Sequence, residues 1–230
     1  MFDIGIIGAM TDEVKTITEM LEDRACESVS GIEFNTGYLF GKRVVVAKCG
    51  VGKVFAAICA EAMALRYQPR LIVNTGVGGA LDKSLRPLDV VIASSLVQHD
   101  MDTSPIGDPV GLISGINKIY FDTDPRAVEV LAAAAKELGL NSMVGIIASG
   151  DKFVAKAEDK CYIRDTFSAV SCEMEGAAIA HTAFVNEIPF VVVRAISDSA
   201  DGDASMDYMT FLPKAADAST KLTLALVERY

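Results

Sequence analysis

Short apolar runs alternate with longer helix-like segments along almost the whole chain, and this alternation restricts its fold more than any other feature. The pattern predicts strands at 2–9, 43–48, 71–75, 89–97, 143–149 and 190–196, with a strand or hairpin at 28–40. It predicts helices at 11–23, 52–67, 125–138, 158–166, 175–186 and 207–229. Strands that alternate with helices are typical of α/β layered proteins with a largely central sheet. No repeat or interdomain linker interrupts the pattern, so we expect one domain over residues 1–230.

Length, charge and cysteine content exclude several classes of protein. The 230 residues suffice for one domain with a substantial core. The net charge of −10 argues against binding to nucleic acids or anionic membranes, because phosphates would be repelled. No apolar stretch approaches the ~20 residues of a membrane span, and Met1 leads straight into a strand without a basic segment, so no secretory signal is expected. Five cysteines without CxxC spacing fit reduced thiols in the cytoplasm. The only histidines, His99 and His181, are far apart in sequence, which argues against a metal site.

Acidic residues stand at the edges of apolar segments in the second half of the chain. Glu173 and Glu175 lie at the start of a predicted helix, and Asp198 ends the apolar strand that begins at Val191. A buried ionised group costs several kcal/mol unless it is paired or serves a function. In the simpler interpretation, the glutamates favour a helix N-terminus and Asp198 caps a turn. Together with a third acidic site, described next, they favour acid–base chemistry or recognition of a polar ligand.

The third acidic site follows the first predicted strand, where Asp12 and Glu13 begin a helix. The preceding GIIGAM segment, Gly5–Met10, lacks the GxGxxG spacing of a dinucleotide fingerprint. Acids at a helix start commonly interact with the helix dipole. A functional carboxylate here would repel a phosphate and could hold and deprotonate a water molecule. The glycine-rich segment Gly76–Gly79, after another strand, fits either a tight turn or the close approach of a ligand to the backbone.

Five motifs occur in one order along the chain: GIIGAMxxEV at Gly5–Val14, NTGxxG at Asn74–Gly79, SGDxF at Ser149–Phe153, EME at Glu173–Glu175 and VVVRAISD at Val191–Asp198. In this order they resemble the motifs of bacterial 5′-methylthioadenosine/S-adenosylhomocysteine nucleosidases, within the wider purine nucleoside phosphorylase-like family. The resemblance implies a three-layer αβα fold with a central mixed, twisted β-sheet flanked by helices. It also implies hydrolysis of the N-glycosidic bond of an adenine nucleoside, with no metal or redox cofactor.

The resemblance also implies roles for single residues. Asp198 is similar to the family's general acid at adenine N7, Glu13 to the base for the attacking water, and Glu175 to the residue that binds the ribose hydroxyls. Two carboxyl groups and one water on opposite sides of the bond are the general arrangement of glycoside hydrolysis. The other positions implied to bind substrate are Met10, Val51, Gly78, Gly79, Phe153, Val154, Glu173, Met174, Ser197 and Tyr208, together with Ile106 from the partner subunit.

Three features differ from the commonest family pattern. Val77 stands where a small polar residue is frequent, and Tyr208 stands where phenylalanine is frequent. The loop over residues 98–122 lacks the aromatic residues often found there, although it holds apolar residues such as Ile106. We expect a symmetric homodimer that buries this loop and in which each subunit helps to close the other's pocket for the 5′-substituent.

The residues leave three other functions to be weighed: a phosphate-dependent purine nucleoside phosphorylase, an aminodeoxyfutalosine-type nucleosidase and a non-catalytic nucleoside-binding protein. A phosphorylase needs arginines around the phosphate, whereas no arginine precedes Arg24. Binding alone would not require three acids. Arg194, inside an apolar strand, is expected to pair with a carboxylate, and His181 to pack in a core or an interface. Cys172 has no neighbouring basic residue and is not expected to act as a nucleophile.

Overall fold

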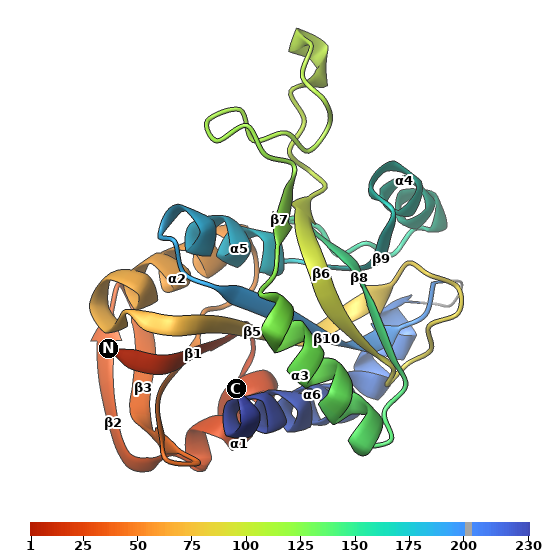
Figure 1. The fold of residues 1–230 in the computed structure, drawn as a ribbon. Coiled ribbons are helices and arrows are strands. Elements are labelled where there is room, and N and C mark those ends of the chain that lie inside the picture. The colour runs from red at the N-terminus through yellow and green to blue at the C-terminus, as the bar shows by residue number, and fades with distance from the viewer. Residues whose placement is uncertain (201–203) are drawn as a thin grey trace.

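The computed structural model describes residues 1–200 and 204–230, without the side chains of 204–207. The strands are β1 (Phe2–Gly8), β2 (Glu22–Val29), β3 (Ile32–Leu39), β4 (Lys42–Lys48), β5 (Pro69–Ala80), β6 (Val90–Gln98), β7 (Tyr120–Asp122), β8 (Ser142–Ser149), β9 (Ala169–Glu173) and β10 (Phe190–Asp198). The helices are α1 (Thr11–Glu19), α2 (Lys53–Tyr67), α3 (Pro125–Glu137), α4 (Ala157–Phe167), α5 (Gly176–Val185) and α6 (Ala204–Arg229), with one 3₁₀ turn, η1 (Ser104–Ile106) (Figure 1).

The strands found in the described residues belong to one mixed sheet, in the order β10-β6-β8-β9-β5-β1-β4-β3-β2, with β7 beside β6. Strand β5 pairs in parallel with both β1 and β10. Strand β6 is antiparallel to β10, and β9 is antiparallel to β5. Because β10 pairs with both β5 and β6, the five strands β10, β6, β8, β9 and β5 close into a ring. A single sheet therefore unites both halves of the chain, and one domain over residues 1–230 stays a prediction.

Helices cover both faces of this sheet, as Figure 1 shows. Helices α1, α3 and α6 pack on one face, around a core that includes Ile17, Leu131 and Leu226. Helices α2 and α5 pack on the other face, around Met63 and Ile179. Central strands covered on both faces have near-continuous apolar sequences, which is why the strand signal is strong in β1, β5 and β10. The arrangement confirms the predicted three-layer αβα class with a central mixed sheet.

Several details of the predicted element pattern are wrong, and the three-residue strand β7 also lies inside the segment 98–122 that was expected to be a loop. Helix α1 ends at Glu19, and the residues predicted as its last turn begin the edge strand β2, whose exposed side chains lack apolar periodicity. The segment Gly76–Gly79 is not a tight turn, because β5 continues through it to Ala80. Strand β9 is only five residues long, and the sequence pattern gives no indication of it.

The loop between β6 and β7 stands away from the body of the subunit (Figure 1). It contains η1 and an isolated bridge between Ile113 and Lys118. Ile106, in η1, is 82% exposed. The described helices include none with the length and apolar character needed to cross a bilayer.

Candidate active site

One cavity gathers almost all the predicted site residues. Strands β1, β5 and β10 run parallel, so their carboxyl ends meet at one edge of the sheet, where α/β proteins commonly bind ligands. The predicted residues that line the cavity are Met10, Glu13, Val51, Gly78, Gly79, Phe153, Val154, Glu173, Met174, Glu175, Ser197, Asp198 and Tyr208. The remaining one, Ile106, is not among the lining residues of its own subunit. Ala9, Val77, Lys152 and Cys172 also line the cavity, although they were not among the predicted site residues.

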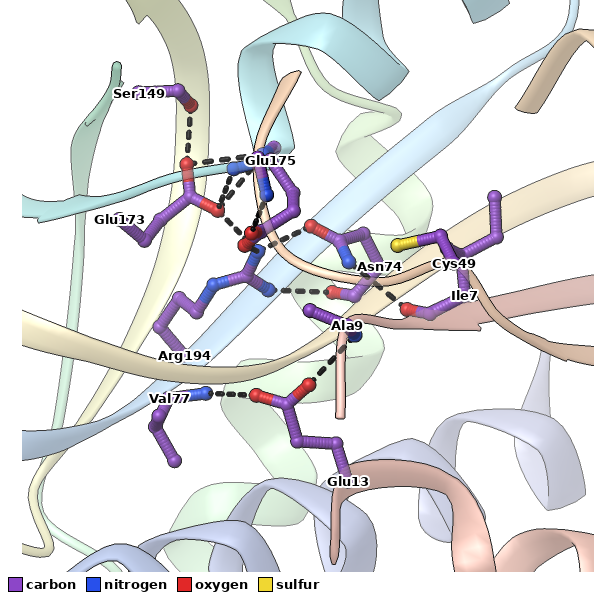
Figure 2. Close-up of polar contacts among 12 residues, drawn as sticks. Ile7, Ala9, Glu13, Cys49, Asn74, Val77, Ser149, Glu173, Glu175 and Arg194 are labelled. Carbon is purple, nitrogen blue, oxygen red and sulfur yellow. Dashed lines mark hydrogen bonds and ion pairs between the residues drawn. The ribbon is translucent and has the colours of Figure 1, made fainter. Parts of the chain in front are cut away.

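Glu13 is held from two elements of the fold (Figure 2). Its Oε2 accepts hydrogen bonds from the backbone nitrogens of Ala9 (2.7 Å) and Met10 (2.9 Å), at the start of α1. Its Oε1 accepts from the backbone nitrogen of Val77 in β5 (3.0 Å). A Cβ atom at Gly76 would overlap Oε1, so this approach needs glycine. The Glu13 carboxylate therefore accepts hydrogen bonds at the helix start and also lines the cavity, while its role toward a water molecule stays a prediction.

Burial is the largest influence on the pKa of Glu13. The side chain is 3% exposed, and burial raises the pKa of Glu13 above its ordinary value of 4.5. The positive charge of Arg194 and the three backbone hydrogen bonds act in the opposite direction on this pKa. A carboxylate with a raised pKa that accepts fixed backbone hydrogen bonds is a suitable base for a water molecule.

Glu173 forms the centre of a buried polar network at the other side of the cavity (Figure 2). It accepts hydrogen bonds from the Ser149 hydroxyl and from the backbone nitrogens of Glu175 (3.1 Å) and Gly176 (2.8 Å). It also forms a close ion pair with Arg194. Glu173 is therefore the carboxylate partner that was expected for Arg194, a residue that lies inside the sheet and is 1% exposed. The contacts to Glu175 and Gly176 match the simpler interpretation of Glu173 as a helix-start acid.

Glu175 is positioned by the same network. Its Oε2 lies 3.9 Å from the Arg194 guanidinium, and its Oε1 accepts a hydrogen bond from the backbone nitrogen of Gly52 (2.8 Å). Burial, followed by the charge of Glu173, raises the pKa of Glu175 to about 7. One guanidinium thus interacts with the charges of three buried carboxylates, those of Glu13, Glu173 and Glu175. With a pKa of about 7, Glu175 keeps its proton in part of the molecules near neutral pH.

Asp198 ends β10 at the opposite wall and is 2% exposed. Its Oδ1 accepts a hydrogen bond from the Ser197 hydroxyl (3.0 Å), and its Oδ2 lies 3.2 Å from the ammonium of Lys160 in α4. A Cβ atom at Gly79 would lie 2.9 Å from Oδ2, so glycine leaves room for the carboxylate. The sequence does not indicate Lys160 as a site residue, because nothing in its local sequence separates it from the exposed lysines around it.

The rest of the lining is mostly apolar. The rings of Phe153 and Tyr208 meet edge to face with centroids 5.5 Å apart. The Tyr208 hydroxyl donates to Met10 Sδ at 3.3 Å. Val51 and Met174 add apolar surface to the same cavity. Aromatic rings and polarizable thioethers suit a flat, partly apolar ligand.

Other candidate groups have structural explanations. The ring of His181 stacks on Phe121 with a centroid distance of 5.3 Å. Cys172 lines the cavity, but burial raises the pKa of its thiol to about 12, so it remains a neutral thiol. Within the described parts of the chain, no group of three or more His, Cys, Asp or Glu side chains is arranged to hold a metal ion.

Comparisons with known proteins agree with this geometry. The family model of the phosphorylase superfamily matches residues 3–228. A 5′-methylthioadenosine/S-adenosylhomocysteine nucleosidase of Staphylococcus aureus (strain JH9) is 39% identical over 98% of this chain and 99% of its own length. The crystal structure of the corresponding enzyme from Neisseria meningitidis, in complex with methylthio-immucillin-A, is 35% identical with a TM-score of 0.96 and full coverage of both chains. A futalosine hydrolase of Helicobacter pylori is 34% identical with a TM-score of 0.94 and covers 100% of this chain and 98% of its own. The chain therefore belongs to the phosphorylase superfamily and, within it, to the family of 5′-methylthioadenosine/S-adenosylhomocysteine nucleosidases.

Proposed function

We propose that this protein hydrolyses the N-glycosidic bond of 5′-methylthioadenosine, S-adenosylhomocysteine or both, releasing adenine and the 5-thio-substituted ribose. One observation carries the proposal: the buried carboxylates of Glu13, Glu175 and Asp198 come from three separate elements and line one apolar cavity. Relatives that bear this activity in their names span the whole chain, which supports the same conclusion.

In the proposed mechanism, the proton of Asp198 moves to N7 of adenine as the glycosidic bond breaks. The bonding electrons pass to the base, which leaves as neutral adenine, and Asp198 is left as a carboxylate. Glu13 takes a proton from the water that attacks the ribosyl cation. Glu175 accepts hydrogen bonds from the ribose hydroxyls, and its negative charge stabilises the cation. Phe153 stacks on the adenine, and the backbone of Val154 bonds to its edge.

The same cavity argues for water over phosphate as the nucleophile. Among its described lining residues, Glu13, Glu173, Glu175 and Asp198 are acidic, and Lys152 is the only basic one. Lys152 is itself paired with Asp159 at 2.6 Å. Arg194 is not among the lining residues, and its guanidinium forms an ion pair with Glu173. A phosphate dianion would meet negative charge here, which disfavours a phosphorylase.

Adenine release tests this function. The purified protein should release adenine from methylthioadenosine at the same rate with and without phosphate. A rate that depends on phosphate would identify a phosphorylase, and no release from any adenine nucleoside would identify a binding protein. Glu13→Gln should abolish release while nucleoside binding stays measurable, since the amide cannot accept the water proton.

A second candidate function is hydrolysis of an aminodeoxyfutalosine-type nucleoside. It is favoured by the likeness to the futalosine hydrolase, whose identity to this chain is close to that of the methylthioadenosine enzymes. The bond cleaved and the acids required are the same, and the difference lies in the 5′-substituent. Competition between methylthioadenosine and such a nucleoside, measured as relative kcat/KM, ranks the two.

We also propose a symmetric homodimer in which Ile106 of the partner subunit closes the pocket for the 5′-substituent. Apolar side chains are exposed on α2 (Val54, Leu65) and on α5 (Val185), besides Ile106 itself. Together they offer more apolar surface than an isolated subunit commonly exposes. Sedimentation should show a dimer at micromolar concentration. A monomer with full activity would contradict the proposal.

A cytoplasmic, reducing location is proposed from the cysteines. All five are free: Cys49, Cys59 and Cys172 are buried, and Cys26 and Cys161 are exposed. Reaction of the unfolded protein with a thiol reagent should count five thiols in material purified from cells without reductant. A lower count would indicate a disulfide and an oxidising location.

A further inference from the structure

Lys160 is the one buried cation on the Asp198 side of the cavity among the residues that the structure describes, and the mechanism above leaves it without a task. It projects from α4, outside the five motifs of the family. Its side chain is 4% exposed and that of Asp198 is 3% exposed. A lysine is rarely buried so deeply unless its charge is paired or used.

Two contacts fix the position of the ammonium. Lys160 Nζ donates to the backbone carbonyl of Ser199 at 2.6 Å and to Asp198 Oδ2 at 3.2 Å. The backbone contact holds the ammonium directly behind the carboxyl group, and the Ser197 hydroxyl holds the other oxygen of Asp198. The carboxyl group is thus oriented through both of its oxygens, while its residue still lines the cavity.

The charge of Lys160 acts on both forms of Asp198. At 3.2 Å in a buried site, the ammonium favours the carboxylate that Asp198 becomes when it donates its proton. It therefore makes Asp198 a stronger acid toward N7. In the substrate-free enzyme, the same interaction causes Asp198 to lose its proton at a lower pH.

The other titratable groups near this pair do not replace Lys160. Described groups that face it are Cys172 of β9 and Tyr208 of α6, with Glu13 and Glu173 across the cavity. The glutamates carry negative charge when ionised, and burial raises the pKa of both the Cys172 thiol and the Tyr208 hydroxyl, which keeps them neutral.

We propose that Lys160 is a positioning residue for the acid: it orients the Asp198 carboxyl group, strengthens it as a proton donor and sets the upper pH limit of catalysis. This inference rests on the proposed function, in which Asp198 protonates the leaving base. It assigns a task to a residue that is not among the lining residues of the cavity.

The test is the pH profile of kcat/KM for methylthioadenosine in three variants. Lys160→Gln keeps a hydrogen-bond donor for Ser199 but removes the charge, Lys160→Arg keeps the charge, and Lys156→Gln removes an exposed charge at the start of the same helix. In Lys160→Gln the alkaline limb should move to higher pH by about one unit or more, and the plateau rate should fall. Lys160→Arg and Lys156→Gln should keep the limb of the wild type.

If Lys160→Gln lowers kcat/KM by the same factor at every pH and leaves the alkaline limb where it is in the wild type, Lys160 has only a structural role. The same conclusion follows if Lys160→Arg shifts the alkaline limb as far as Lys160→Gln does. If Lys160→Gln does not fold, infrared difference spectra of the wild type against Asp198→Asn decide the matter. The Asp198 carboxyl group should lose its proton at the pH of the alkaline limb, and a carboxyl group that keeps its proton above that pH would overturn the inference. Adenine release by the wild type tests the proposed function separately, so the two failures are distinguishable.

Discussion

The Oε1 atom of Glu13 lies 3.0 Å from the backbone nitrogen of Val77, so the first helix and the central strand β5 together fix one carboxylate. The contact exists only because position 76 carries no side chain. It links the glycine-rich segment to the acid after the first strand, two features that lie more than sixty residues apart.

Gly76→Ala should therefore impair catalysis through Glu13. The added methyl group overlaps Oε1 and displaces the carboxylate, and a displacement of about 1 Å can cost about 100-fold in rate. The free energy of unfolding should fall by about 1–3 kcal/mol from overpacking. Gly139→Ala is the control for lost stability alone, since a Cβ atom there meets no neighbour within 4 Å and only the left-handed backbone, with φ at 67°, is strained. Steady-state kinetics and denaturant unfolding of both variants check this, and equal activity in the two would remove the steric argument.

Asp198→Asn should remove the acid. An amide cannot deliver the N7 proton, so turnover should fall by about 10²–10⁴-fold. The change also takes a negative charge away from buried Lys160, and stability should fall by about 3 kcal/mol while the protein remains folded. Circular dichroism and single-turnover adenine release separate these effects. Turnover near that of the wild type would show that Asp198 is not the general acid.

Glu175→Gln should weaken both binding and turnover, because the carboxylate contacts the ribose hydroxyls in the ground state and in the transition state. A 2′-deoxy nucleoside already lacks one of these contacts. It should lose less activity in the variant than the normal substrate does. The measurement is kcat/KM for both nucleosides in both enzymes, and equal losses would show that Glu175 does not contact that hydroxyl.

Activity and stability should respond to pH in opposite directions. Burial raises the pKa of Glu175 from 4.5 to about 7 and raises that of Glu13 as well, and both groups act as carboxylates. The kcat/KM value should therefore fall as pH falls below about 7. Between about pH 4.5 and 7 the folded state binds more protons than the unfolded state, so the free energy of unfolding should decrease as pH rises. Unfolding at two pH values within this window, in the wild type and in Glu175→Gln, measures the effect. An unchanged slope in the variant would assign it to another group.

The 5′-substituent should be selected by apolar contact. Met10, Val51, Met174 and Tyr208 line the cavity, and an apolar pocket distinguishes one methylene by only about 1–3 kcal/mol. Methylthioadenosine should be cleaved well and 5′-deoxyadenosine measurably. Adenosine should be poorer by about tenfold or more, because its 5′-hydroxyl would be buried near Met10 with Tyr208 as its polar neighbour. A clear preference for adenosine in kcat/KM would contradict this view of the pocket.

The sequence by itself determined the layered class of the fold and most of the residues that line the cavity. Continuous apolar runs such as Val191–Ile196 mark strands that are covered on both faces, and this signal is local. The resemblance that the ordered motifs carry indicated thirteen residues that line the cavity of this chain. Ten of them lie within the motifs, each of which ends a strand or begins a helix at one edge of the sheet.

Only the tertiary structure decided which charges face one another. Arg194 had an expected carboxylate partner but no identified one until β9 placed Glu173 beside it. Lys160 was indistinguishable from exposed lysines, because its burial depends on how α4 packs against β9 and the end of β10. The exposed strand β2 and the short strand β9 also escaped prediction. Local sequence records periodicity and capping, whereas pairing across the sheet depends on contacts between residues that are distant in the chain.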